Sequence, residues 1–365
     1  MDTYNIYKDI NARTQGEIYI GVVGPVRSGK STFIKHFAEK LILPFMSDGA
    51  GKERTKDELP QSAAGRTVMT TEPKFIPREA CVINPAQDIS MKIRLIDCVG
   101  FMIDGATGVV EDGKERLVKT PWYDYEIPFS EAAEFGTRKV IKDHSTVGIV
   151  MTTDGSIGEL PRDSYKAAEA ATIEELKKIG KPFVVVVNSK NPAAKSAAEC
   201  VDEIKKAYGA EAVSLDCEQL TLDDVNRTLE LLLNSFPING IEFYFDRWIE
   251  TLPDDNEIKQ AMVECAGQIL DRITYIKDFN KDSIKVENKY IEDVRSEPVD
   301  MADGIIRLSF KVDENLYYDM LSSIAGEKID NEYELINLIK EYAKEKSALS
   351  RYTSAIDTVR QKGYG

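Results

Sequence analysis

The sequence is poor in zinc-binding residues and has no long apolar segment. Its 365 residues include two histidines and five cysteines, and the cysteines are widely spaced, without a C-x-x-C pair. Neither a zinc site nor a disulfide framework is therefore expected. The N-terminus lacks the apolar core of a signal peptide, and the longest aliphatic run, Val184 to Val187, is far shorter than the roughly 20 residues of a membrane-spanning helix. These absences indicate a cytosolic chain without a transmembrane segment.

Acidic residues outnumber basic residues in this chain. Its 47 lysine and arginine residues stand against 62 aspartate and glutamate residues, which gives a net charge of -15 at pH 7. Nucleic acids and anionic lipids are bound by basic surfaces, so general affinity for either is not expected, and membrane contact would be local or made through a partner. With 42% apolar and 30% charged residues, the chain is long enough for two soluble domains.

One glycine-rich segment carries the clearest chemical signal. Residues 24–31 read GPVRSGKS, which fits the pattern of glycine, four free positions, glycine, lysine and serine. A β-branched run, Ile18 to Val23, precedes the segment, and apolar residues at helical spacing follow it. In such a context of strand, loop and helix, the backbone N–H groups of the loop face phosphate. We expect Lys30 to contact the terminal phosphates of a nucleotide and Ser31 to supply a hydroxyl to Mg²⁺.

A second predicted strand ends in an acidic motif. Residues 91–96 alternate apolar and basic side chains and lead into Asp97, Cys98, Val99 and Gly100. Asp97, at the end of a buried strand, is placed to hold the water shell of Mg²⁺, and Gly100 could offer its N–H to the γ-phosphate. A D-x-x-G motif alone is usually a turn, but its position after a phosphate loop favours the functional interpretation.

Two adjacent threonines, Thr70 and Thr71, lie in a polar segment between these motifs. A threonine on a mobile loop can close onto Mg²⁺ and the γ-phosphate and thereby sense whether that phosphate is present. The alternative is a plain threonine-rich strand edge. The sequence does not separate the two threonines, so the predicted metal-contacting residues are Ser31, Thr70, Thr71 and Asp97.

Arg27 is an unusual member of the phosphate loop. Some related GTPases hold a potassium ion beside the phosphates at this loop position, and a guanidinium there could supply the same charge from within the chain. The alternative is a solvent-facing or salt-bridged arginine. The predicted catalytic residues are Lys30, Thr70, Thr71, Asp97 and Arg27. The residues predicted to bind the nucleotide are Gly24, Pro25, Val26, Arg27, Ser28, Gly29, Lys30, Ser31, Thr32, Gly100 and Asn188.

The remaining pattern of the first half predicts an α/β fold. Two more aliphatic strands, residues 146–151 and 183–187, flank a helical pattern that ends at Gly180. Such strands alternating with helices are typical of a mostly parallel sheet covered on both faces. The predicted fold class is an α/β P-loop NTPase domain of the translation-factor-like GTPase type over residues 1–235, followed by a smaller α+β domain over residues 236–365.

The second half shows elements but no catalytic constellation. An amphipathic helix is predicted from Asn256 to Ile273 and a half-buried strand over residues 304–311. The last helix, residues 331–360, carries a broad apolar stripe interrupted by Lys346. That stripe predicts either packing on its own domain or a surface for self-association.

The expected base-reading motif departs from that of GTP-binding proteins. After a strand of this kind GTPases carry Asn-Lys-x-Asp, whereas this chain has Asn188, Ser189, Lys190 and Asn191. An amide in place of the guanine-reading carboxylate can also donate, so a preference for guanine loses its basis and ATP is favoured. Phe101 stands where GTPases often have a water-positioning glutamine, and a phenyl ring cannot orient water by conventional hydrogen bonding.

Together, the segments YIGVVGPVRSGKSTFIK, MTTEP, LIDCVG and VVVVNSKNP resemble the stage four sporulation protein A family, the coat-morphogenesis ATPase of endospore formers. The resemblance covers the whole chain, and its specificity lies mainly in the phosphate loop. It implies an ATPase that uses ATP and Mg²⁺, polymerises with copies of itself and forms the basement layer of the spore coat. By motif position, Lys30, Ser31, Asp97 and one threonine of the pair match the family's functional residues.

The resemblance also implies a location and partners. The protein would act in the cytoplasm of the mother cell, at the outer forespore membrane, recruited there by a small amphipathic peptide and joined by other coat proteins. Members of the family continue into a further C-terminal domain, whereas this sequence stops at RQKGYG. We therefore expect a truncated form, in which polymerisation and localisation could be impaired. A GTPase switch and a non-hydrolysing nucleotide-binding scaffold remain as alternative functions.

Overall fold

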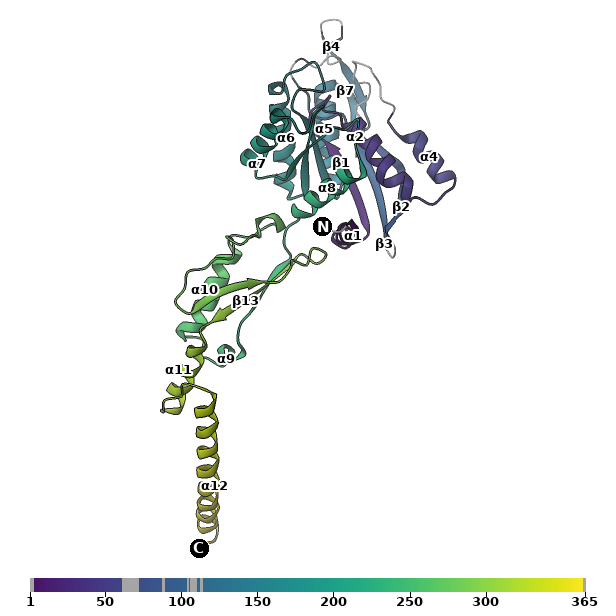
Figure 1. Cartoon of the computed structure of the whole chain (residues 1–365). Coiled ribbons are helices and arrows are strands. Elements are labelled where there is room, and N and C mark those ends of the chain that lie inside the picture. Colours follow the sequence, from purple (N-terminus) through teal and green to yellow (C-terminus); the bar gives the residue numbers. More distant parts are fainter. Residues whose placement is uncertain are drawn as a thin grey trace. The chain divides into compact units, whose positions relative to one another are not determined.

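The computed structural model contains two compact units of the chain (Figure 1). It describes residues 3–60, 72–86, 89–103, 105, 110–111 and 114–363. The first unit consists of residues 1–240, 273–280 and 299–306, and the second of residues 241–272, 281–298 and 307–365. The predicted domain boundary between residues 235 and 236 stays a prediction. By packing, two short segments from beyond residue 240 lie with the first unit, and Ile276 and Met301 from these segments are buried in its core.

A six-stranded sheet forms the centre of the first unit. Its strand order is β10-β9-β8-β1-β3-β2, and all neighbours are parallel except β2, which runs antiparallel to β3. The strands are β1 (Glu17–Val23), β2 (Lys74–Ala86), β3 (Ile89–Asp97), β8 (Val147–Thr153), β9 (Phe183–Asn188) and β10 (Ala212–Leu215). Every residue of β8 and β9 is buried, as unbroken aliphatic strands predict. The structure therefore confirms the predicted α/β class with a mostly parallel sheet.

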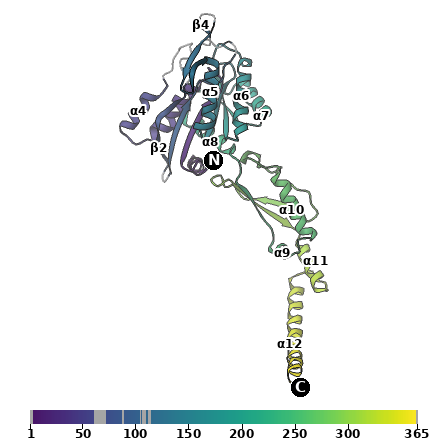
Figure 2. The ribbon, with the colours of Figure 1, turned by 180° about the vertical axis from the view of Figure 1, so that it is seen from behind.

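Helices cover both faces of this sheet, as the two opposite views show (Figure 2). Apolar side chains of α1, α2 and α8 pack on one face, and those of α6, α7 and η2 (Val140–His144), which directly follows α5, pack on the other. These helices are α1 (Thr3–Arg13), α2 (Lys30–Phe37), α5 (Phe129–Lys139), α6 (Asp163–Ile179), α7 (Lys195–Tyr208) and α8 (Leu222–Asn234). Because the sheet is covered on both sides, the C-terminal strand ends remain as the natural place for a ligand.

Shorter elements complete the first unit. They are η1 (Ala38–Ile42), α3 (Leu43–Phe45), α4 (Ala50–Glu58), η2 (Val140–His144), η3 (Ile276–Asp278) and the strand pairs β4 (Val110–Glu111) with β5 (Lys114–Glu115) and β6 (Leu117–Thr120) with β7 (Tyr123–Pro128). The β6–β7 pair is antiparallel and continues directly into α5.

The second unit combines a three-stranded sheet with helices, as the predicted α+β mixture requires. The sheet order is β11-β13-β12, with β13 antiparallel to β12. The elements are β11 (Gly240–Tyr244), α9 (Arg247–Glu250), α10 (Glu257–Leu270), β12 (Ile291–Ser296), β13 (Ile305–Val312), α11 (Glu314–Ala325) and α12 (Glu332–Lys362). Alternate residues of β13 are buried, which confirms the half-buried strand predicted there.

The apolar stripe of α12 is largely exposed. Leu349 is 62% exposed, Tyr352 70% and Ile356 53%. Packing of this stripe on its own domain was one of two predictions. Tyr342 donates its hydroxyl to the carbonyl oxygen of Ala325 at 3.1 Å, and the described residues of the stripe beyond it do not show such packing. Among the described residues, no helix is long and apolar enough to cross a bilayer.

Candidate functional site

The phosphate loop joins β1 to α2 and depends on two glycines. Gly24 has φ +127° and Gly29 has φ +92°, conformations that residues with a side chain rarely adopt. A Cβ at Gly24 would lie 2.2 Å from the carbonyl oxygen of Met151, and one at Gly29 would lie 2.2 Å from Nδ2 of Asn188. Both the backbone conformation and the close packing therefore require glycine at these two positions. The loop that they allow places the start of α2 at the C-terminal edge of the sheet.

The Lys30 side chain is buried inside this loop. Its ammonium donates to the carbonyl oxygen of Pro25 at 2.6 Å and to that of Gly24 at 3.3 Å, while the Ser28 hydroxyl also donates to Pro25 at 2.9 Å. Burial lowers the pKa of Lys30, because the charged form loses its hydration. Phosphate oxygens carry full charge, so they are stronger acceptors for this ammonium than the two carbonyl groups.

Ser31 and Asp97 meet at the opening of the loop. The Ser31 hydroxyl donates to Oδ2 of Asp97 at 2.7 Å. Oδ1 of Asp97 is buried and has no hydrogen-bond partner in the described part of the chain. Burial raises the pKa of Asp97, and the bond from Ser31 and the charge of Lys30 only partly oppose this. A buried carboxylate oxygen without a partner, beside a hydroxyl, fits a hydrated Mg²⁺.

The end of β3 is joined to the phosphate loop by backbone bonds. The N–H of Val26 donates to Phe101 at 2.9 Å, and the N–H of Phe101 donates to Gly24 at 3.2 Å. Gly100 has φ +97°, and its N–H donates to the Thr137 hydroxyl at 3.2 Å, so contact with a γ-phosphate would require this bond to be exchanged. The Phe101 ring is buried among apolar side chains that include residues of α6, which assigns it to packing.

Asn188 connects the two ends of the candidate site. Its Nδ2 donates to the carbonyl oxygen of Ser28 in the phosphate loop at 3.2 Å. Its Oδ1 accepts from the N–H of Cys217, just after β10, at 3.2 Å. One buried amide therefore fixes the distance between the phosphate loop and the loop that follows β10.

A hydroxyl network orders the segment that follows Asn188. The Ser189 hydroxyl donates to Oδ2 of Asp154 at 2.7 Å, and the Ser156 hydroxyl donates to Oδ1 of Asp154 at 2.6 Å. The N–H of Lys190 donates to Ser156, and the N–H of Asn191 donates to Ser189. The serine that replaces the GTPase lysine thus has a structural partner in the loop after β8.

These elements surround a cavity of about 430 Å³ at the C-terminal edge of the sheet. A cavity of this size is in the range of small-molecule sites. Its lining residues are Val26, Arg27, Gly29, Lys30, Ser31, Thr32, Glu72, Lys74, Asp97, Cys98, Val99, Ile157, Asn188, Lys190, Asp216 and Glu218. Predicted residues from three separate motifs therefore lie around one space.

Among the predicted catalytic residues, the structure describes Arg27 but not the threonine pair. Arg27 lines the cavity and has φ +60°, which is uncommon for a residue with a side chain. Its charge lowers the pKa of Tyr165, although burial of that phenol is the larger effect and raises it. Thr70 and Thr71 lie outside the described residues, so their sensor role stays a prediction.

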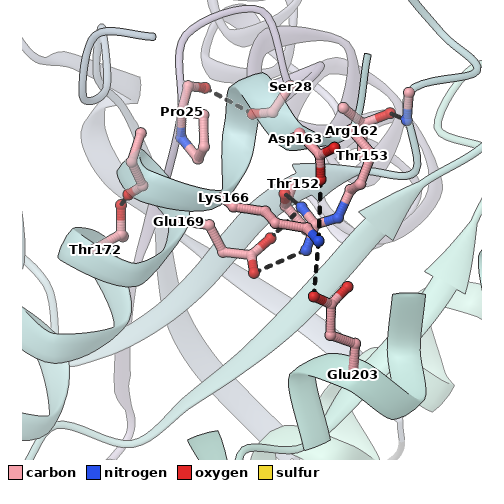
Figure 3. A network of polar contacts seen from close by, with 12 residues as sticks. Pro25, Ser28, Thr152, Thr153, Arg162, Asp163, Lys166, Glu169, Thr172 and Glu203 are labelled. Carbon is pink, nitrogen blue, oxygen red and sulfur yellow. Dashed lines mark hydrogen bonds and ion pairs between the residues drawn. The ribbon is translucent and has the colours of Figure 1, made fainter. Parts of the chain in front are cut away.

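A buried ion pair that the sequence analysis did not find supports the neighbouring helix (Figure 3). Arg162 binds both carboxylate oxygens of Glu169, at 2.5 and 2.9 Å, and donates to the Thr152 hydroxyl at the end of β8 at 2.9 Å. On the same helix Lys166 pairs with Glu203 of α7 at 2.9 Å. Charged residues seven positions apart are also common on solvated helix faces, so the sequence does not distinguish this pair. Its burial does.

Several residues that line the cavity were not predicted from the sequence. Among them, Ile157, Asp216 and Glu218 belong to loops without a recognisable motif. Their position directly after β8 and β10 is the signal that could have found them, because loops at the C-terminal ends of parallel strands gather at one edge.

Comparisons with known proteins identify the family of this chain. Residues 1–237 match the family model described as stage IV sporulation protein A, ATPase domain, and residues 238–365 match that of its middle domain. Stage IV sporulation protein A of Clostridioides difficile is 40% identical over 363 residues, 99% of this chain and 74% of that protein. The Bacillus subtilis protein is 37% identical over 366 residues, 100% of this chain and 74% of that protein.

A solved structure of Toc33 from Arabidopsis thaliana is similar to 63% of this chain over 90% of its own length, with 9% identity and a TM-score of 0.36. The two family matches cover the chain from end to end. The chain therefore belongs to the stage IV sporulation protein A family, with the ATPase domain of that family followed by its middle domain.

Proposed function

We propose that this protein binds and hydrolyses ATP and uses that reaction to assemble with copies of itself into the basement layer of the spore coat. The observation that supports the chemistry best is the group of Lys30, Ser31 and Asp97 at one cavity, with Oδ1 of Asp97 buried and unpartnered among the described residues. The match to a sporulation ATPase domain supports the choice of nucleoside triphosphate and the biological setting.

Each residue of this group has a distinct task in the proposed reaction. Lys30 would leave the carbonyl groups of its own loop and bind the terminal phosphates, where its charge stabilises the transition state. Ser31 and Asp97 would hold Mg²⁺, which neutralises phosphate charge when bound. Arg27 would add a further positive charge from the loop. Thr70 or Thr71 would report the presence of the γ-phosphate.

Assembly would follow from loop movement after hydrolysis. Release of the γ-phosphate changes which loop conformation is favoured, and a loop near the site can expose or hide a contact surface. Because the net charge is -15, we propose that membrane contact is made through a small amphipathic peptide rather than by general attraction to anionic lipid. The proposed place is the mother-cell side of the outer forespore membrane, together with other coat proteins.

The test is turnover of ATP and GTP by the purified protein, measured as phosphate release, with light scattering recorded in the same samples. We expect ATP turnover, a rise in scattering that depends on ATP, and loss of both in Lys30→Ala. Lys40→Ala is the matched control, because it makes the same chemical change at an exposed lysine that does not line the cavity.

Three outcomes decide among the functions. A strong preference for GTP would favour a switch GTPase. Binding of ATP without phosphate release would favour a scaffold that does not hydrolyse nucleotide. ATP turnover without a change in scattering would separate hydrolysis from assembly and overturn that part of the proposal.

A further inference from the structure

The loop that follows β10 closes the far end of the nucleotide cavity. The phosphate loop follows β1, and the sheet order places β8 and β9 between β1 and β10. Asn188 lies between the two loops, and its side chain bonds to Ser28 in the phosphate loop and to Cys217 in the β10 loop. Asp216 and Glu218 line this end of the cavity. A triphosphate bound at Lys30 would therefore direct its base toward these residues.

The backbone donors of this loop are already used. The N–H of Cys217 donates to Asn188, and those of Glu218 and Gln219 donate to Oδ1 of Asp216 at 2.9 and 3.3 Å. A purine with an oxygen at position 6, such as guanine, needs a donor opposite that atom. Because three consecutive N–H groups have acceptors within the protein, they cannot serve a 6-oxo group without breaking these bonds.

The facing segment after β9 has used its donors in the same way. The N–H of Ser189 donates to Leu215 at 2.9 Å, and those of Lys190 and Asn191 donate to serine hydroxyls at 3.0 and 3.1 Å. Apart from the Lys190 ammonium, the side chains of these two loops that remain available at the cavity are the carboxylates of Asp216 and Glu218, which accept hydrogen bonds. The half-buried Asp216 is the best placed acceptor, because two N–H groups fix its carboxylate through Oδ1, while Oδ2 has no hydrogen bond within the described residues.

We propose that Asp216 selects adenine by accepting a hydrogen bond from the 6-amino group through Oδ2. The inference rests on the proposed ATP-binding function and names the residue that sets its base preference. Opposite position 6, a carboxylate oxygen accepts from the amino group of adenine and repels the oxo group of guanine or hypoxanthine, so one side chain acts on both affinities. The carboxylate of GTPases differs in position, because it faces the N1–H and 2-amino donors of guanine. Asp216 is a specificity residue, distant from the reacting phosphates.

The experiment compares ATP with inosine triphosphate (ITP), which carries an oxygen in place of the 6-amino group. Calorimetric titrations in Mg²⁺ would measure both dissociation constants for the wild type, Asp216→Asn and Asp223→Asn. The asparagine side chain can keep the oxygen that caps the turn, but it presents a donor where Oδ2 stood. We expect the preference for ATP over ITP to fall by about 10- to 100-fold, the usual effect of one hydrogen bond to a charged group.

Asp223→Asn is the matched control, since it makes the same chemical change seven residues away from Asp216. Asp223 is exposed in the first turn of α8. We expect its ATP to ITP ratio to stay within about twofold of the wild type, well under the effect of one such hydrogen bond. Purine riboside triphosphate, which lacks any 6-substituent, gives a test on the unmodified protein. It should bind the wild type about tenfold or more weakly than ATP.

The outcomes separate this inference from the proposed function. An unchanged ATP to ITP ratio in Asp216→Asn, or equal binding of purine riboside triphosphate and ATP, would overturn the role of Asp216 while ATP binding stands. A wild-type preference for ITP would also overturn it and would point to the Lys190 ammonium as a donor on the same wall. Absence of any nucleotide binding by the wild type would overturn both proposals.

Discussion

The two units use the same kinds of side chain in opposite ways. In the first unit, aliphatic residues of β8 and β9 are buried on both faces, and polar groups around the cavity are bonded to one another. In the second unit, α12 repeats apolar residues at helical spacing over 31 residues, yet those from Tyr342 onward are exposed where the structure describes them. Regular apolar spacing therefore marks a core in one unit and an open surface in the other.

The units also differ in backbone strain. Among the described residues, the positive-φ positions that are not glycine are Gln15 and Arg27, and both lie in the first unit. Arg27 lies beside the cavity, as does the unpartnered oxygen of Asp97. Local costs of this kind persist where the surrounding structure is stable enough to hold them, and they often accompany function.

The largest expected difference between the units concerns ion pairs. Glu169→Ala should lower the free energy of unfolding by about 3–5 kcal/mol, because it leaves the largely buried Arg162 without its carboxylate. Glu292→Ala in the second unit removes an exposed pair with Lys311 and should cost about 0–1 kcal/mol. Urea unfolding followed by circular dichroism measures both. Equal costs would contradict the contrast between buried and exposed pairs.

The same truncation in two helices should sharpen the contrast between the apolar faces. Leu176 of α6 is fully buried, and its methyl groups contact β8 at Gly148, so Leu176→Ala should cost about 2–5 kcal/mol of unfolding free energy. Leu349→Ala in α12 should change that free energy by less than about 0.5 kcal/mol. A large loss in Leu349→Ala, measured by urea unfolding at several protein concentrations, would show that α12 is covered in solution.

The pH dependence of nucleotide binding tests the site of the first unit. Burial raises the pKa of Asp97, so its carboxylate takes up a proton at a higher pH than an ordinary aspartate does. Affinity for Mg²⁺-ATP should be complete above that raised pKa and fall by about tenfold per pH unit below it. Titration calorimetry between neutral and acidic pH measures this fall in affinity, with Asp97→Asn as the control. If Asp97→Asn shows the same fall, another group is responsible for it.

The smallest expected effect concerns Arg27. Glycine adopts φ +60° without strain, so Arg27→Gly should leave the nucleotide-free protein about 1 kcal/mol more stable than Arg27→Ala. If the guanidinium stabilises the transition state, both variants should hydrolyse ATP more slowly, and added potassium should restore part of the rate. Thermal unfolding and phosphate release measure the two effects. Unchanged turnover in both variants, with or without potassium, would remove Arg27 from the catalytic residues.

Much of the site was predictable because it depends on short motifs in a fixed order. Residues 24–31 specify the loop, since glycine alone tolerates the backbone of Gly24 and Gly29, and Asp97 follows from its position at the end of an apolar strand. The preference for ATP was inferred from what Asn191 lacks as a guanine reader. The structure adds that the N–H groups at that end already have acceptors.

The sequence by itself determined the α/β class, the phosphate loop and the family, because local patterns and glycine requirements are set by neighbouring residues. Tertiary structure alone decided which distant groups meet: Asn188 bonded to Ser28 and Cys217, and Arg162 buried against Glu169. It also decided that the stripe of α12 is exposed from Tyr342 onward. Burial depends on what packs against a residue from elsewhere in the chain, and the spacing of apolar residues records only that one face of a helix differs from the other.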